Sequence, residues 1–129
     1  MGRWHTGCAK KGMSPQDKQA LQLPHHKLIA WQVAAELLQL VARIRINDAE
    51  LRQQARKSAK SAVLNTAEGA ARQTLADKSR AYAIALAEGC ECCAAVEAAG
   101  MLGACSPAHV HEVLVLGVRL KNLLSRLIR

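Results

Sequence analysis

The hydrophobic residues of this chain recur every three or four positions from Lys27 onward, which is the spacing of α-helices with one buried face. The first such stretch predicts a helix over residues 27–46. Its apolar stripe is unusually wide, which indicates a helix buried on more than one side. The stripe consists of Leu28, Trp31, Val33, Ala35, Leu37, Leu38, Leu40, Val41, Ala42 and Ile44. Trp31 could stack on a nucleic-acid base, but its place within the stripe favours the core.

A second helix is predicted over residues 47–67, with Asn47 as its N-cap, Glu50 in the capping-box position and Gly69 as its C-cap. Small residues fall on one face of this helix, which would let a neighbouring helix approach closely. That face holds Leu51, Ala55, Ala59, Ala62, Thr66 and Gly69. The opposite face carries a basic stripe of Arg52, Arg56, Lys57 and Lys60, which must face solvent or an acidic partner.

Two more helices complete the pattern. Thr74, with Asp77 three residues later, predicts the start of a helix over residues 75–102. Ser106 followed by Pro107 predicts the start of the last helix. This last helix carries a second basic patch of Arg119, Lys121 and Arg126. The predicted fold is therefore all-α: an up-down-up-down four-helix bundle over residues 24–129.

Residues 1–23 show no sustained periodicity and contain several glycines, so we expect a flexible tail with one weak turn around Ser14–Leu21. Trp4, His5 and Cys8 fall in this tail.

Part of the predicted basic helix also resembles the sequences of a known protein family. The matching residues are Gln54, Arg56, Lys57, Ala59, Ser61, Asn65, Ala67, Glu68 and Gly69. The chain resembles bacterial four-helix-bundle proteins encoded in intervening sequences of large-subunit ribosomal RNA genes, and it is similar to accessory proteins of diversity-generating retroelements. The segment 28–38, which contains Trp31, and the segment 82–103 match as well, so the resemblance covers about residues 26–129. Lys57 stands where the family usually has Arg.

The resemblance implies a ring-shaped homo-oligomer, commonly a homopentamer, and a setting of RNA, DNA and possible assistance to a reverse transcriptase. Trp31, Gln54, Asn65, Glu68 and Gly69 are its structural signature. Asn65 and Glu68 could be read as a catalytic or ligand-binding pair. An amide and a carboxylate near a helix end more often satisfy loose backbone groups and order the next loop.

The net charge of the chain indicates which class of partner it would bind. Eighteen Lys and Arg against ten Asp and Glu give a formal net charge of +8, which favours polyanions. By contrast, residues 81–105 contain three acids, Glu88, Glu91 and Glu97, and no Lys or Arg. Opposite charges on two helices of one subunit would let neighbouring copies dock. No apolar run approaches the roughly 20 residues that span a bilayer, so we expect no membrane partner.

Cysteine usage bears on the compartment and on metal binding. Five cysteines, three of them Cys90, Cys92 and Cys93, do not resemble a disulfide framework, and a cytoplasmic location follows. A zinc site would need Cys90 and Cys93 together with Cys105 and His109 or His111, without a second CxxC to support it. Cysteine as a small apolar residue is the simpler interpretation. The paired His25 and His26 are read as solvated. We therefore expect no metal and no cofactor.

Two functions remain. The chain lacks a phosphate loop, a nucleophile elbow and an HExxH motif, so an enzyme is not expected. The first hypothesis is a nucleic-acid-binding accessory protein whose contacts are made to phosphates and are weakly sequence-specific, because aromatic residues for stacking are scarce. The alternative is a structural or scaffold oligomer that binds a protein partner through the same basic face.

Overall fold

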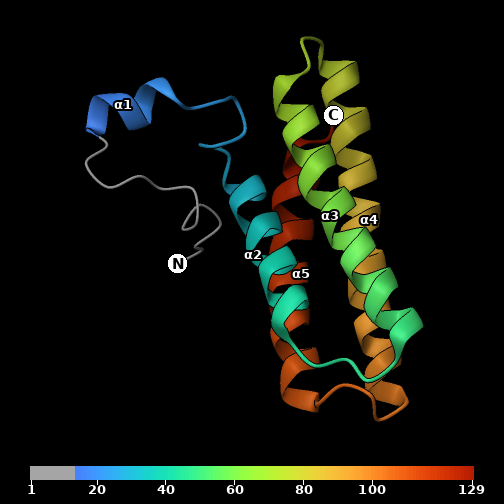
Figure 1. Ribbon diagram of the computed structural model, residues 1–129. Coiled ribbons are helices and arrows are strands. Elements are labelled where there is room, and N and C mark those ends of the chain that lie inside the picture. The colour runs from blue at the N-terminus through green and yellow to red at the C-terminus, as the bar shows by residue number, and fades with distance from the viewer. Residues whose placement is uncertain (1–13) are drawn as a thin grey trace.

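The computed structural model describes residues 14–129 (Figure 1). This part of the chain contains five α-helices and no strand, so the all-α prediction is confirmed. The helices are α1 (Pro15–Ala20), α2 (Ile29–Arg43), α3 (Ala49–Ala71), α4 (Leu75–Met101) and α5 (Pro107–Leu127).

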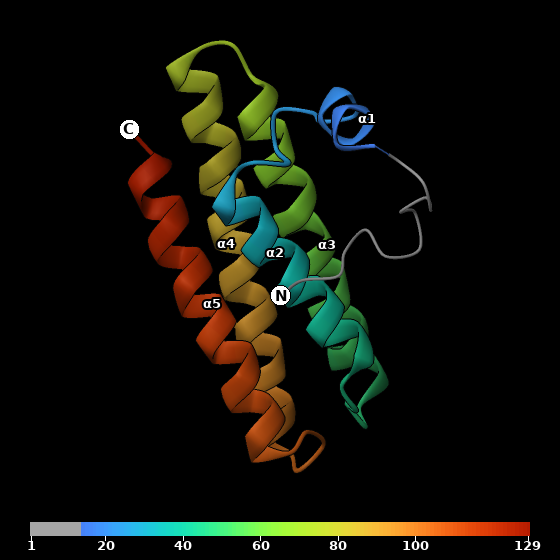
Figure 2. The ribbon, with the colours of Figure 1, turned by 90° about the vertical axis from the view of Figure 1, so that its left-hand side faces the viewer.

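The short helix α1 falls where the weak turn was predicted. Ser14 and Asp17 cap it reciprocally: the Asp17 amide donates to Ser14 Oγ at 3.1 Å, and the Ser14 amide donates to Asp17 Oδ2 at 3.2 Å. Figure 2 shows α1 standing to one side of the four long helices. Trp4, His5 and Cys8 lie outside the described residues.

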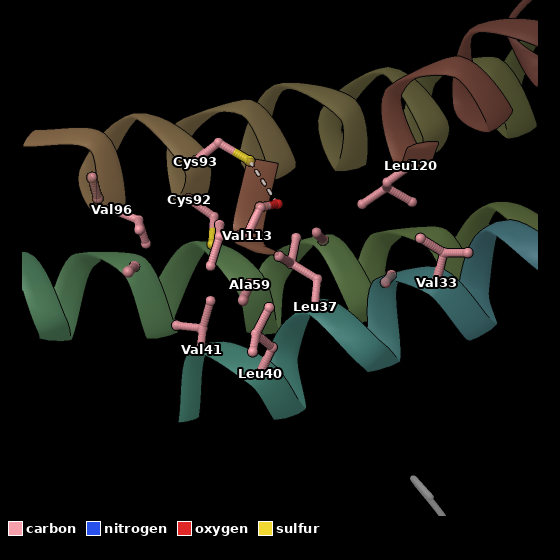
Figure 3. Close-up of a cluster of buried hydrophobic side chains, with 14 of the residues drawn as sticks. Val33, Leu37, Leu40, Val41, Ala59, Cys92, Cys93, Val96, Val113 and Leu120 are labelled. Atoms are coloured by element: carbon pink, nitrogen blue, oxygen red, sulfur yellow. Dashed lines mark hydrogen bonds between the residues drawn. The ribbon is translucent and has the colours of Figure 1, made fainter. Parts of the chain in front are cut away.

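The long helices α2 to α5 run side by side, and consecutive helices point in opposite directions (Figures 1 and 2). Helix α2 packs against α3 and α5, and α4 packs against the same two helices. Their shared core is mostly aliphatic. Figure 3 shows Leu37 and Val41 of α2 facing Ala59 of α3 and Val113 of α5. The sequence contains no Phe, and Leu, Val and Ala side chains pack between the helices instead.

The predicted faces of the helices are largely confirmed. On α3 the small residues Ala55, Ala59, Ala62, Thr66 and Gly69 are all buried. On α2 the stripe is buried through Trp31, Val33, Leu37, Leu40 and Val41, but Ala42 is exposed. Small side chains on α3 permit the close approach of α4, so the backbone separation of this pair is set by Ala and Gly positions.

The predicted end of the first long helix was wrong. Helix α2 stops at Arg43, and residues 44–48 are extended. Ile44 and Ile46 are nevertheless buried, at 5% and 2% exposed, because alternate residues of an extended segment point to the same side. The apolar residues of this segment keep the helical spacing in the sequence, although the backbone is no longer helical and turns toward α3.

The predicted start of α3 was wrong by one residue. Asp48, not Asn47, is the N-cap, and its carboxylate accepts from the Leu51 amide at 2.9 Å. The Asn47 amide instead donates to the carbonyl of Ala104 at 2.8 Å, which ties this turn to the α4–α5 loop. An Asp and an Asn at adjacent positions are both good caps, so the local sequence alone does not choose between them.

The prediction of Gly69 as a C-cap was also wrong. Helix α3 continues to Ala71, and Gly69 lies inside it. Lys78 of α4 reaches back so that its ammonium group donates to the carbonyls of Gly69 and Ala70 at 3.2 and 3.0 Å. These last carbonyls have no partner within the helix, and the cation also suits the helix dipole.

The other predicted caps are confirmed. The Thr74 hydroxyl accepts from the Asp77 amide, and the Ser106 hydroxyl accepts from the His109 amide, with Pro107 in the first turn of α5. None of the helices in the described residues is long and apolar enough to cross a membrane.

Candidate nucleic-acid interface

The predicted basic stripe forms one surface of α3. Arg52, Arg56, Lys57 and Lys60 line a shallow hollow of about 460 Å³ together with Ala49 and Gln53, here called the α3 hollow. The i, i+4, i+8 spacing therefore places the charges together as the sequence predicted. Among the residues that the structure describes, no carboxylate lines the α3 hollow.

The two arginines of the α3 hollow are held by the chain itself. Arg52 Nη1 donates to the carbonyl of Ile46 at 2.7 Å, and Arg56 Nη2 donates to the carbonyl of Ala42 at 3.0 Å. The burial of Ile44 and Ile46 brings this extended segment alongside α3. Both guanidinium groups are thus ordered before any ligand arrives.

The two lysines differ from the arginines. Lys57 and Lys60 are exposed, as ammonium groups on long stems usually are. The α3 hollow therefore combines two cations that are hydrogen-bonded to backbone carbonyls with two exposed ones.

Sequence reasoning missed Arg45. This exposed residue lies between the buried Ile44 and Ile46 and precedes the carbonyl that accepts from Arg52. The signal was available: an apolar, basic, apolar alternation indicates an extended segment that points one cation outward.

The second basic patch is placed elsewhere. Arg119, Lys121 and Arg126 are exposed on α5, which packs against α2 and α4. Arg119 and Arg126, seven residues apart, share one side of the helix, and Lys121 lies on another. The α5 patch is thus a separate and looser surface from the α3 hollow.

The structural-signature residues have structural contacts. Asn65 Nδ2 donates to the Ser61 carbonyl at 2.9 Å and to its hydroxyl at 3.1 Å. Glu68 pairs with Arg72 at 2.8 Å on the exposed last turn of α3. Asn65 and Glu68 bind separate partners, and neither contacts the other in these bonds.

Gln54 links α3 to α4. Its Nε2 donates to Ser58 Oγ at 3.0 Å and also to Glu91 Oε2. One of the three acids of α4 is therefore engaged by a neutral amide of α3 in the same chain. Neither Gln54 nor Glu91 lines the α3 hollow.

Trp31 belongs to the core boundary and is 8% exposed. Its ring contacts those of His25 and His26, with centroids 4.7 and 5.6 Å away. The two imidazole rings lie 4.3 Å apart. Burial lowers the pKa of His25, and the neighbouring His26 lowers it further. The two histidines are thus partly buried packing residues, and the prediction that they are solvated was wrong.

A second hollow of about 380 Å³ lies between α2 and α5 and is here called the α2–α5 groove. Carboxylates and cations mix on its walls, so it has no single charge character. It is lined by Glu36, Gln39, Leu40, Arg43, His111, Glu112, Val115 and Leu116.

The cysteines of α4 point in different directions. Cys90 is exposed, whereas Cys92 and Cys93 are buried and face the core, where Cys93 lies 4.0 Å from the Val113 carbonyl (Figure 3). Burial, above all, raises the pKa of Cys92 to about 12 and that of Cys93 to about 11. Protonated thiols are poor metal ligands. Within residues 14–129, no three His, Cys, Asp or Glu side chains converge as a metal site requires.

Comparisons with known proteins complete the description of the site. No curated protein matches the chain. The sequence profile of the 23S rRNA-intervening sequence protein family matches residues 26–126, which span α2, α3, α4 and nearly all of α5. Because this match covers most of the chain and contains the α3 hollow, we conclude that the chain belongs to the 23S rRNA-intervening sequence protein family.

Proposed function

We propose that this chain is a non-enzymatic basic accessory protein that binds RNA or DNA through phosphate contacts. The observation that carries the proposal is the α3 hollow, where four cations gather and no carboxylate competes with a ligand. Phosphate contacts of this kind supply affinity without reading the base sequence. Assistance to a reverse transcriptase is part of the proposal, since such an enzyme works on nucleic acid.

We propose further that α2 to α5 form an up-down-up-down four-helix bundle that assembles with its copies into a ring, as a homopentamer. Large apolar side chains that remain exposed support such contacts, among them Ile84 of α4 and Val115 and Val118 of α5. Four unpaired cysteines in the described residues support a reducing, cytoplasmic setting.

The same exposed apolar residues favour the second candidate, a structural or scaffold oligomer whose partner is a protein. In that case the α3 hollow would hold acidic side chains of the partner. Salt dependence separates the two candidates, because each phosphate contact releases condensed counterions from a nucleic acid.

The test compares two charge-matched variants by salt titration against structured RNA and duplex DNA. Lys57→Gln with Lys60→Gln removes two exposed cations of the α3 hollow and leaves the arginines in place. Arg119→Gln with Arg126→Gln removes two cations from α5 and serves as the matched control. If the α3 hollow binds, only the first variant should lower the salt slope, by about two units.

Two outcomes would contradict this proposal. An unchanged slope in the α3 variant with a lower slope in the α5 variant would move the interface to Arg119, Lys121 and Arg126. Failure of the wild-type chain to bind either polymer at low salt would favour the protein-scaffold candidate.

A further inference from the structure

The arginines and lysines of the α3 hollow present different chemistry to a ligand. A guanidinium has five N–H donors in a planar fork. Arg52 and Arg56 each use one of these donors on a backbone carbonyl, at 2.7 and 3.0 Å. Most of their donors therefore remain for another acceptor, and their side-chain freedom is already restricted. Lys57 and Lys60 offer single point charges without such restriction.

One donor of Arg56 finds no acceptor within residues 14–129. Its Nε–H is buried, and it is the one buried side-chain nitrogen or oxygen in the described residues that lacks a hydrogen-bond partner. A buried donor of a charged group without a partner carries a free-energy penalty. The buried Nε–H is closed to a ligand, so Arg56 would contact a phosphate through the Nη donors that the Ala42 carbonyl leaves open.

The spacing of the cations in the α3 hollow suits a row of several anions better than a single anion. Arg52, Arg56 and Lys60 recur every four residues, so their Cα atoms are spaced by roughly 6 Å along α3. The hollow that they line, about 460 Å³, has room for more than one phosphate group. An arginine fork can donate two parallel hydrogen bonds to the paired oxygens of a phosphate.

We propose that Arg52 and Arg56 form a pre-ordered phosphate cradle, which grips the nucleic-acid backbone by paired hydrogen bonds while Lys57 and Lys60 neutralise the adjoining phosphates. The inference rests on the proposed function and assigns different roles to the two residue types. It also has a structural consequence. A phosphate held by both arginines stabilises the α2–α3 connection, because the same two side chains hold the carbonyls of Ala42 and Ile46.

The test replaces the arginines by lysines, which keeps the positive charge and removes the planar guanidinium fork. Arg52→Lys with Arg56→Lys preserves four cations, so the salt slope for a single-stranded oligoribonucleotide should stay the same. The affinity should fall about tenfold, since a lysine cannot pair two phosphate oxygens in one plane. The matched control, Lys57→Arg with Lys60→Arg, should bind at least as tightly as the wild type. Circular dichroism checks folding, and the two single arginine variants replace the double variant if it unfolds.

A second measurement uses inorganic pyrophosphate as the probe. It should raise the thermal midpoint of the wild-type chain and of the lysine-to-arginine control, and raise that of the arginine-to-lysine variant much less. If the arginine-to-lysine variant binds RNA and pyrophosphate as the wild type does, the cradle is overturned while the proposed function stands. If pyrophosphate stabilises the chain through the arginines but RNA does not bind, the cradle holds free phosphate and the proposed function fails.

Discussion

At the scale of single residues, Gly69 shows how contact across helices determines a residue type. Within α3, it faces the buried ring of Tyr82 on α4. A β-carbon at position 69 would lie 2.5 Å from Tyr82 Cε1 and 2.6 Å from Cδ1, which no real structure tolerates without movement. The glycine is therefore needed for the close approach of two helices and not for a turn.

We expect Gly69→Ala to destabilise the fold by a net amount on the order of 1 kcal/mol. Overpacking a core costs typically about 1–3 kcal/mol, while Gly→Ala inside a helix returns roughly 1 kcal/mol. Gly89→Ala is the matched control, because its nearest neighbour is the flexible end of Leu120 at 3.2 Å. Urea unfolding of both variants measures the difference. An alanine at position 69 that proved as stable as one at position 89 would contradict the packing argument.

At the scale of elements, the turn before α2 is built from side chains in place of a helix cap. Leu28 provides no side-chain cap for α2. The Leu23 amide donates to His26 Nδ1 at 2.8 Å, and Gln32 Nε2 donates to the His26 carbonyl at 2.9 Å. These two hydrogen bonds, together with the packing of both imidazole rings on Trp31, order the entry to α2.

This turn predicts that the chain loses stability in mild acid. Burial, and then the neighbouring His26, lower the pKa of His25 in the folded chain below its ordinary value of 6.5. Below about pH 6.5 the unfolded chain then binds more protons at this site, so stability falls as the pH falls and levels off below the folded pKa. Thermal midpoints from pH 7.5 to pH 5 should show a smaller drop for His25→Gln than for the wild type.

The control for this pH effect is His111→Gln, which removes an exposed imidazole on α5 and should follow the wild-type profile. Equal drops in the thermal midpoints of the wild type and of His25→Gln would show that the pH dependence of stability does not arise from His25.

At the scale of the whole molecule, charge is divided between surfaces. The α3 hollow is basic, whereas α4 carries Glu88, Glu91 and Glu97, of which Glu91 is already engaged by Gln54. Exposed apolar residues such as Ile84 and Val118 are available for contacts between copies. A ring assembled through such mixed contacts would bury apolar area and pair opposite charges at its rim.

We therefore expect an oligomer in solution, with a mass several times the 13.9 kDa of one chain. Because rim charges are screened by salt, the assembly should weaken between low and high ionic strength. Light scattering at micromolar concentration, at low and then at high salt, measures both effects. A chain that is monomeric at low salt would refute the proposed ring.

Local sequence patterns predicted much of this structure, because the interactions behind them form between residues that are close in the sequence. Apolar periodicity placed α2 to α5, the caps at Thr74 and Ser106 form within single turns, and the stripe from Arg52 to Lys60 follows from helix geometry alone. Tertiary structure decided what depends on neighbours distant in sequence. The backbone N–H of Asn47 donates to the Ala104 carbonyl, and Gly69 contacts the Tyr82 ring of another helix. Likewise, the carbonyls of Ala42 in α2 and of Ile46 after α2 accept from Arg56 and Arg52, since only folding brings this part of the chain beside α3.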